Sequence, residues 1–251
     1  MSRTSPVHVH NGRGASRYNS RKLNSSQDQT LRSTVTGANT SKILILGLVL
    51  ALCAVVLFGW IAEEMYEGDT MLFDEHVRAV IHAHSSPVLT RIMRLFSLLG
   101  SPLSMTALIL VSFLLFRRLG WNRGAILLAV CMGGGVLLDE VLKLSFRRVR
   151  PVPYFHVVAP TSYSFPSGHA LLSFCFLSVV ASLISARLRN VLAKAAVLTG
   201  AAALVSLIGF SRIYRGVHYP TDVIAGYIAA FIWVTAVTAA DRIYHGRRAR
   251  K

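Results

Sequence analysis

The chain has 251 residues, of which 53% are hydrophobic and only 15% are charged. Soluble domains carry roughly 25% charged residues, so this composition argues against a soluble globular protein. Lysine and arginine number 27 against 11 acidic residues, and the formal net charge of +16 is compatible with either nucleic acid or an anionic membrane surface as a partner. The basic residues flank apolar runs and form no nucleic-acid-binding motif, so we expect a membrane protein that does not bind nucleic acid.

Residues 1–41 are predicted to form a disordered, basic, cytoplasmic tail. They are rich in Ser, Thr, Asn and Arg, contain the single acidic residue Asp28, and show no apolar periodicity. An organellar transit peptide has a similar composition, so that alternative stays open. Residues 42–245 then form one membrane domain without a polar linker, and 246–251 form a second basic tail. The three cysteines lie in apolar stretches, which favours core residues over disulfides.

Six apolar segments are long enough to cross a bilayer, whose hydrocarbon core takes about 20 helical residues. They are residues 43–62, 95–116, 124–143, 170–186, 191–210 and 223–240. Pro102 lies near one end of the second segment, where a kink is tolerated. The few charges inside these segments lie near their ends, where they reach an interface. We therefore predict an all-α fold, a bundle of six transmembrane helices.

The distribution of lysine and arginine predicts the orientation, because basic residues are retained on the cytoplasmic side of a membrane. Both ends of the chain and the loops after the second and fourth segments are basic, whereas the stretch 63–75 contains six acidic residues. Both termini should therefore be cytoplasmic and the protein should lie in the cell membrane, with an organellar membrane as the open alternative. The outer loop 143–169 breaks the pattern, since it contains four basic residues and no acidic one. This excess indicates an anion-binding site on the outer face.

Three short motifs lie in the outer loops. In the first, Lys143 is followed after six residues by Arg150 and Pro151; the second is the run 164–169, SFPSGH; in the third, Ser211 and Arg212 are followed by His218 and Asp222. Their order and spacing resemble the three signature motifs of the type 2 phosphatidic acid phosphatase superfamily. That family of membrane phosphatases shares its helical core with vanadium-dependent haloperoxidases and glucose-6-phosphatase. The resemblance covers the third to the sixth segment and implies the same core here.

The residue types in these motifs suit phosphoryl transfer, which needs fixed cations around the phosphate oxygens. Lys143, Arg150 and Arg212 supply point charge and planar, bidentate donors. Ser167 and Gly168 directly precede the fourth segment, where free backbone amides and the positive end of a helix dipole favour an anion. The resemblance implies that these five residues bind the phosphate.

Two histidines carry the expected chemistry. His218 and Asp222 are four residues apart, and a carboxylate that accepts from one imidazole nitrogen leaves the other nitrogen free to attack. The resemblance implies that His218 is the nucleophile, that Asp222 orients it and that His169 protonates the leaving group, before water hydrolyses the phosphohistidine. One neutral and one charged histidine predict a bell-shaped pH dependence of the rate. The scheme requires no metal and no cofactor.

Several residues near the motifs have simpler interpretations. Lys143 alone would more often extend from a helix end toward the interface. Asp139 and Glu140 precede it by four and three residues, which predicts an ion pair on the helix face. Arg147 and Arg148 are expected to contact lipid headgroups or solvent.

We expect an integral membrane phosphatase that removes the terminal phosphate of a lipid phosphate or diphosphate. Similar bacterial proteins act on undecaprenyl diphosphate, which is the preferred substrate here, or on phosphatidylglycerophosphate or phosphatidic acid. A non-enzymatic lipid or anion carrier is the alternative from another class, although a carrier would place charge nearer the bilayer midplane. A haloperoxidase is disfavoured because those relatives are soluble, and a metal site at His82 and His84 lacks regular ligand spacing. The oligomeric state stays open.

Overall fold

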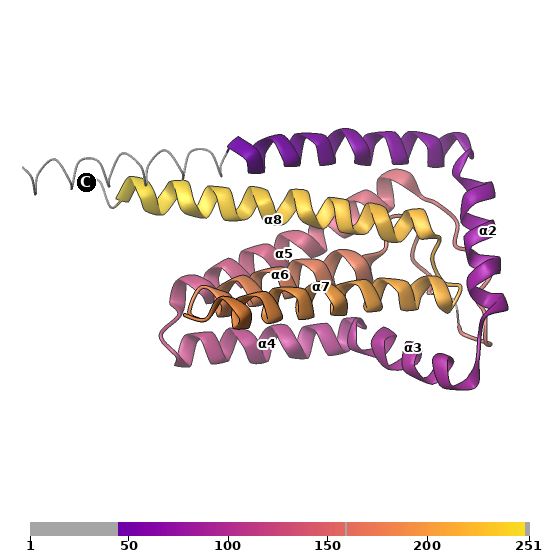
Figure 1. Ribbon diagram of the computed structural model, residues 1–251. Coiled ribbons are helices and arrows are strands. Elements are labelled where there is room, and N and C mark those ends of the chain that lie inside the picture. Colours follow the sequence, from indigo (N-terminus) through magenta and orange to yellow (C-terminus); the bar gives the residue numbers. More distant parts are fainter. Residues whose placement is uncertain (1–44, 159, 249–251) are drawn as a thin grey trace, which may run out of the picture. The chain divides into compact units, whose positions relative to one another are not determined.

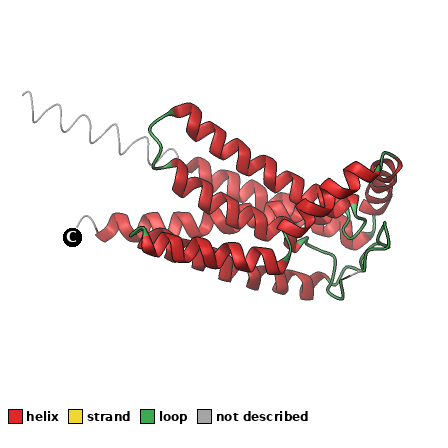
Figure 2. Cartoon of the chain, turned by 90° about the horizontal axis from the view of Figure 1, so that it is seen from below, coloured by secondary structure: helices red, strands yellow, loops and turns green. Residues whose placement is uncertain are grey.

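The computed structural model describes residues 45–158 and 160–248, and the tail predicted at 1–41 lies outside them. Every regular element in the described ranges is an α-helix (Figure 2). The helices are Ile45–Glu67, α2 (Thr70–Ala83), α3 (Pro87–Leu99), α4 (Pro102–Arg118), α5 (Asn122–Phe146), α6 (Gly168–Ser185), α7 (Val191–Tyr214) and α8 (Pro220–Arg248).

Five helices are long and apolar enough to cross a membrane, namely Ile45–Glu67 and α5 to α8. The pair α3 and α4 satisfies the same criteria together, with a bend of 52° at the short break between the two helices. With this pair counted as one span, the described residues contain six, and the predicted all-α, multi-pass fold is confirmed. Large apolar side chains on the helices are exposed, for example Leu103 at 83% and Leu137 at 66%. Lipid explains this exposure, because soluble proteins rarely leave such large apolar surfaces in water.

The second predicted span is interrupted and not merely kinked. The sequence predicts one helix over 95–116, whereas α3 ends at Leu99 and α4 begins at Pro102. The hydroxyl of Ser101 caps α4 by accepting the amide of Ser104 at 3.3 Å. Proline suits the first helical position because it has no N–H to leave unpaired. The local sequence thus ends one helix and starts another.

This break packs closely against α6 and α7. A Cβ atom at Gly100 would lie 2.5 Å from Cγ2 of Ile208 and 3.1 Å from Cδ2 of His169. Only glycine permits this approach without displacing a neighbour. The break between α3 and α4 therefore forms one wall around His169.

Helix α6 is the central element and packs against α5, α7 and α8. Its contact with α5 is made by fully buried side chains, namely Leu128, Cys131, Leu171 and Cys175. Helices α5 and α7 end where α6 and α8 begin (Figure 1). The three sequence motifs consequently meet at one end of the bundle.

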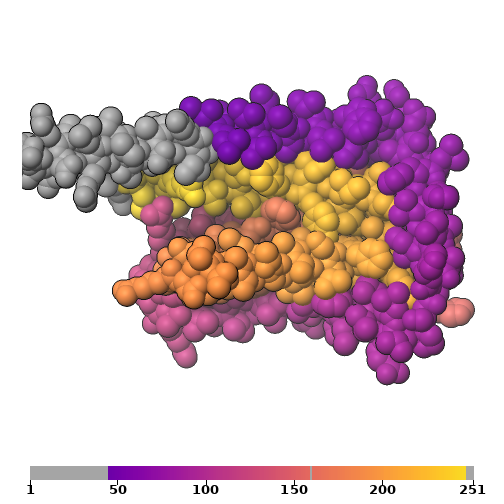
Figure 3. All heavy atoms as spheres, in the orientation of Figure 1, coloured from indigo at the N-terminus to yellow at the C-terminus, as the bar shows by residue number. Residues whose placement is uncertain are grey.

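Helix α2 lies in a stretch that the sequence interpretation left as an outer loop. It runs across the end of the bundle and packs against α7 and α8 (Figures 1 and 3). Its buried residues are Asp74 and Arg78, both charged. Because the buried face of α2 carries charges, its attachment to the bundle could not be predicted from apolar periodicity.

Candidate active site

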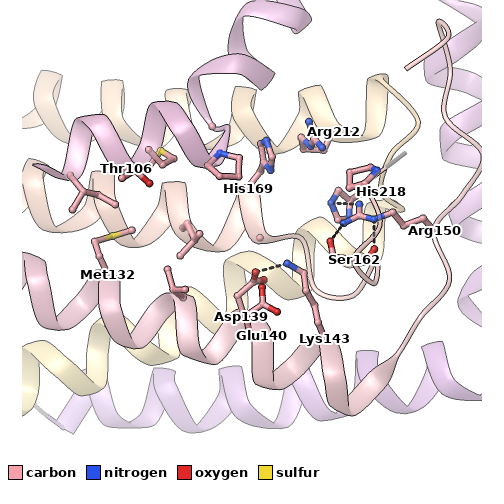
Figure 4. A pocket seen from close by; sticks show the side chains of 18 residues that line it. Thr106, Met132, Asp139, Glu140, Lys143, Arg150, Ser162, His169, Arg212 and His218 are labelled. Carbon is pink, nitrogen blue, oxygen red and sulfur yellow. Dashed lines mark hydrogen bonds and ion pairs between the residues drawn. The ribbon is translucent and has the colours of Figure 1, made fainter. Parts of the chain in front are cut away.

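A cavity of about 500 Å³ lies at the end of the bundle where the motifs meet (Figure 4). Six of the eight predicted site residues line it: Lys143, Arg150, Gly168, His169, Arg212 and His218. The other two, Ser167 and Asp222, are fully buried, and the amide of Ser167 donates to the carbonyl of Asp222 at 2.9 Å. The fold therefore brings all eight together around one space.

The imidazole of His218 is buried between a carboxylate and a guanidinium. Its Nδ1 lies 3.4 Å from Oδ2 of Asp222, and its Nε2 lies 2.9 Å from Nη1 of Arg150. Because a guanidinium only donates, Nε2 accepts this hydrogen bond and the proton lies on Nδ1. Nδ1 makes no hydrogen bond to a described residue, and Oδ2 of Asp222 is the carboxylate oxygen beside it. Burial lowers the pKa of His218 to about 4, although Asp222 opposes the shift. The ring is neutral at pH 7, which is the form that a nucleophile requires.

The carboxylate of Asp222 is held on both oxygens. Its Oδ2 accepts the hydroxyl of Ser164 and the amide of Tyr219, the latter at 2.9 Å. Its Oδ1 accepts Nη1 of Arg148 at 2.7 Å. With both oxygens engaged, the carboxylate cannot rotate away from His218, which is what an orienting group in a catalytic triad requires.

The interpretation of Arg148 as a headgroup or solvent contact is wrong. Its guanidinium is only 8% exposed and forms ion pairs of 2.7 Å with both Asp74 and Asp222. It also lies over the ring of Tyr219, 4.1 Å from the ring centre. The cap of α5, Arg147, has a left-handed φ of 48°, so the chain turns and the next side chain points inward. The spacing of residues in the motif does not predict that Arg148 is buried and Arg147 exposed. The partner of Arg148, Asp74, lies in α2, which is distant in the sequence.

Lys143 lies beside the first turn of α6. Its ammonium pairs with the carboxylate of Asp139, so the predicted ion pair is present. A Cβ atom at Gly168 would lie 2.7 Å from Oδ2 of Asp139 and 3.0 Å from Nζ of Lys143, so the pair needs glycine there. The hydroxyl of Ser167, the N-cap residue of α6, is buried and has no partner among the described residues. Together with the free amides of the first turn, this hydroxyl can donate to an anion.

Two guanidiniums, half-buried Arg150 and buried Arg212, make no ion pair with another described residue. Arg150 donates to the carbonyl of Val217 at 2.9 Å, and burial lowers the pKa of Arg150. Arg212 donates from Nη1 to Oγ of Ser97 at 2.5 Å, while its Nε is buried without a partner. Arg215 reaches the same hydroxyl at 2.7 Å. Buried charges are normally paired, so this wall of the cavity suits an anion with several oxygens.

The cavity changes from polar to apolar along its length. Beyond His169 its lining comes from α4, α5 and α6 and includes Met105, Ile109, Met132, Val136 and Leu172. Figure 4 shows Met132 and the cationic side chains at opposite ends. An amphiphile fits such a space, with its anionic head among the cations and its apolar part along the helices.

The metal-site alternative gains no support from the geometry. In the described part of the chain, no three side chains of His, Cys, Asp or Glu are grouped so that they could hold a metal ion. His82 instead stacks on Tyr154, with ring centres 3.9 Å apart. Nδ1 of His84 lies 2.8 Å from the carbonyl of Val80 in its own helix.

Fold and site together define a helical membrane protein in which a histidine and a carboxylate face buried cations. Its sequence matches the family model of the PAP2 superfamily over residues 124–243. It is 32% identical over 184 residues to phosphatidylglycerophosphatase B of Bacillus subtilis (strain 168), a match that covers 72% of this chain and 89% of that protein. The chain belongs to the PAP2 superfamily, and the predicted family is confirmed.

Two further comparisons agree with this assignment. The chain is 34% identical over 128 residues to an undecaprenyl-diphosphatase of Sulfolobus acidocaldarius, covering 49% of this chain and 55% of that protein. The crystal structure of a transmembrane PAP2 type phosphatidylglycerolphosphate phosphatase from Bacillus subtilis matches with a TM-score of 0.69 and 26% identity, over 76% of this chain and 96% of that chain. LpxE of Aquifex aeolicus shares the fold, with a TM-score of 0.51 and 24% identity over 66% of this chain and 95% of that chain. Both curated relatives are phosphatases by name, so the predicted enzyme class, a hydrolase of phosphoric esters, is confirmed.

Proposed function

We propose that the chain removes the terminal phosphate of a lipid phosphate or diphosphate through a phosphohistidine intermediate on His218. One observation carries the proposal. Arg150 and Arg212, which make no ion pair with a described residue, and the neutral ring of His218 share the polar end of a cavity whose other end is apolar. A phosphate on a lipid meets both requirements, because its charge fills the polar end while its chain remains in the bilayer.

In the first step, the phosphate oxygens lie among Lys143, Arg150 and Arg212. The hydrogen bond that Arg150 donates to His218 passes to the phosphate, which frees Nε2. Nε2 then attacks phosphorus, the bond to the leaving oxygen breaks, and His169 gives its proton to that oxygen. Asp222 stabilises the positive charge that develops on the ring of His218.

In the second step, a water molecule attacks the phosphorus of the intermediate and gives its proton to His169, which is now neutral. The phosphorus–nitrogen bond breaks, inorganic phosphate leaves, and both histidines return to their starting protonation states. The same three cations hold the phosphate oxygens in both transition states. Apart from the proton of the attacking water, the named residues supply every proton and charge in this scheme.

Undecaprenyl diphosphate is the substrate that we propose first, with phosphatidylglycerophosphate or phosphatidic acid as the alternative. The name of the Sulfolobus acidocaldarius relative supports undecaprenyl diphosphate. The name of the Bacillus subtilis relative supports phosphatidylglycerophosphate. The residues of the motifs contact the phosphate and not the chain, so they do not discriminate among these lipids.

We further propose that the site faces the outer side of the cell membrane and that both termini are cytoplasmic. The loops at the opposite end of the bundle are basic and include exposed Arg117, Arg118 and Arg187. At the site end, the end of the helix Ile45–Glu67 carries Glu64 and Glu67, and α2 carries further acidic residues. Basic loops are retained in the cytoplasm, which supports this orientation.

The test is phosphate release by detergent-purified protein from undecaprenyl diphosphate, phosphatidylglycerophosphate, phosphatidic acid and a soluble phosphomonoester, in excess EDTA. His218→Ala is the control variant. We expect release from at least one lipid that survives chelation and vanishes in the variant. No release by folded protein, or release unchanged by the substitution, would contradict the mechanism and favour a lipid or anion carrier.

A further inference from the structure

Helix α2 contributes a carboxylate that lies directly behind the proposed catalytic pair. Asp74 is fully buried, although it lies outside residues 124–243, over which the family model matches. Its Oδ1 accepts the amide of Thr221 at 3.0 Å, and its Oδ2 accepts the hydroxyl of Thr221 at 2.6 Å. Asp74 therefore satisfies a free amide in the first turn of α8, the helix that carries Asp222.

Asp74 and Asp222 share one guanidinium. Arg148 donates from Nη2 to Oδ2 of Asp74 and from Nη1 to Oδ1 of Asp222, both at 2.7 Å. Nη1 also reaches Oγ1 of Thr221 at 2.8 Å, so the threonine hydroxyl links Asp74 to Arg148 a second time. This network fixes the position of Asp222 through an element that is distant in the sequence.

The network also sets how much negative charge Asp222 presents to His218. Burial alone would lower the pKa of Arg148, but the two carboxylates outweigh it and the pKa is raised, so the guanidinium stays charged. One cation thus compensates two buried carboxylates. Without Asp74, the whole charge of Arg148 would be available to Asp222, and the potential at His218 would become more positive.

We propose that Asp74 is a positioning residue for phosphoryl transfer, which acts through Arg148 and Thr221 to orient Asp222 and to preserve its charge toward His218. This inference rests on the proposed function. Asp74 lines no part of the cavity and contacts no phosphate ligand in the described structure, so its effect should fall on turnover and not on substrate binding.

The experiment compares Asp74→Asn with Glu75→Gln on the lipid that the wild type hydrolyses best. Glu75 is the neighbouring carboxylate, half-exposed, and pairs with Arg78, so its substitution controls for the loss of an acidic group on α2. We expect Asp74→Asn to lower kcat about 10-fold to 100-fold with KM changed less than about 3-fold, since a charged hydrogen-bond acceptor is lost behind the nucleophile. Glu75→Gln should leave both constants near their wild-type values.

The pH dependence of kcat/KM distinguishes a positioning role of Asp74 from a merely structural one. The charged groups that face His218 are Asp222, Arg150, Arg212 and His169. Removing the charge of Asp74 disfavours the imidazolium of His218, so the acid limb of kcat/KM should move to lower pH in Asp74→Asn. With the same substrate for every variant, ionisation of the phosphate contributes equally and cancels in the comparison. Loss of kcat with an unmoved pH profile would overturn the proposal.

Two further measurements keep the inference testable. If Asp74→Asn does not fold, Thr221→Val removes the hydroxyl that links Asp74 to Arg148 at nearly constant volume, and a smaller loss of kcat with the same direction of pH shift is expected. If the wild type hydrolyses no lipid, the proposed function fails, and the titration of labelled histidine by NMR still tests the charge effect without substrate. A pKa for His218 that is unchanged in the variant would overturn the inference even if the phosphatase assay succeeds.

Discussion

The two sides of His218 differ in how their charges are balanced. Behind the ring, the cluster of Asp74, Arg148 and Asp222 is compensated, and both carboxylates have partners within the fold. In front of the ring, Arg150 and Arg212 make no ion pair with described residues. The rear cluster is complete without substrate, whereas the front wall needs an anion. Catalytic orientation and substrate affinity should therefore be separable by substitution.

The largest expected effect comes from breaking the rear cluster. Asp222→Asn keeps the shape but removes the charge that orients and stabilises the ring of His218, so turnover should fall about 10⁴-fold. Thermal unfolding should also occur at lower temperature, because Arg148 loses one of its two counter-ions. Phosphate release and a melting curve measure the two effects. Unchanged turnover in a folded variant would remove Asp222 from the mechanism.

Breaking the front wall should have a different signature. Arg212→Gln is expected to lower kcat/KM by about 10²-fold to 10³-fold, since a cation that stabilises the transition state is lost. Its melting temperature should not fall, because a buried charge without a counter-ion is removed. A large loss of stability would show that Arg212 is compensated by the fold and would break the comparison.

A smaller effect is expected at the start of α6. Gly168→Ala places a methyl group 2.7 Å from Oδ2 of Asp139 and should displace Lys143 from the front wall, lowering kcat/KM on the order of 10-fold. Gly133→Ala on α5 is the matched control, since a Cβ atom there meets nothing within 4 Å. Activity assays on both variants test the prediction, and equal activities would contradict it.

Ligand binding sharpens the comparison without a measurement of turnover. Inorganic phosphate or vanadate should raise the melting temperature of the wild type, because a ligand at about 100 times its Kd adds about 2.7 kcal/mol of stability. The shift should be retained in Asp222→Asn and lost in Arg212→Gln. The reverse result would assign the anion site to the rear cluster.

The smallest effect concerns stability between pH 6.5 and 4. Burial lowers the pKa of His218 to about 4, so in this range the unfolded chain binds a proton that the folded protein does not. The free energy of unfolding should therefore decrease as the pH falls through this window. His218→Asn should show a shallower decrease, which melting curves at several pH values measure. Equal slopes would indicate that the ring is not neutral in the folded state.

Local sequence predicted much of this arrangement because apolar length and motif spacing are local properties. Six spans follow from six apolar runs, but the sequence prediction had one continuous helix with a kink near Pro102, and the break before this residue was missed although Ser101 caps α4. The eight site residues were predicted from three motifs whose members are close in the chain. Arg148 was misassigned because its environment depends on Asp74, which belongs to a short helix whose buried residues are both charged.

The sequence alone therefore determined the class of fold, the number of spans and the residue types that can hold a phosphate. Bilayer thickness restricts the first two, and phosphate chemistry restricts the third. Only the tertiary structure decided which charges are compensated. Arg147 and Arg148 are adjacent and chemically identical, yet one is exposed and the other is buried between Asp74 and Asp222. Whether a charge is compensated depends on its distance from charged groups on other helices. For Arg148 these distances are set by the packing of α2 on α8 and not by any spacing within a motif.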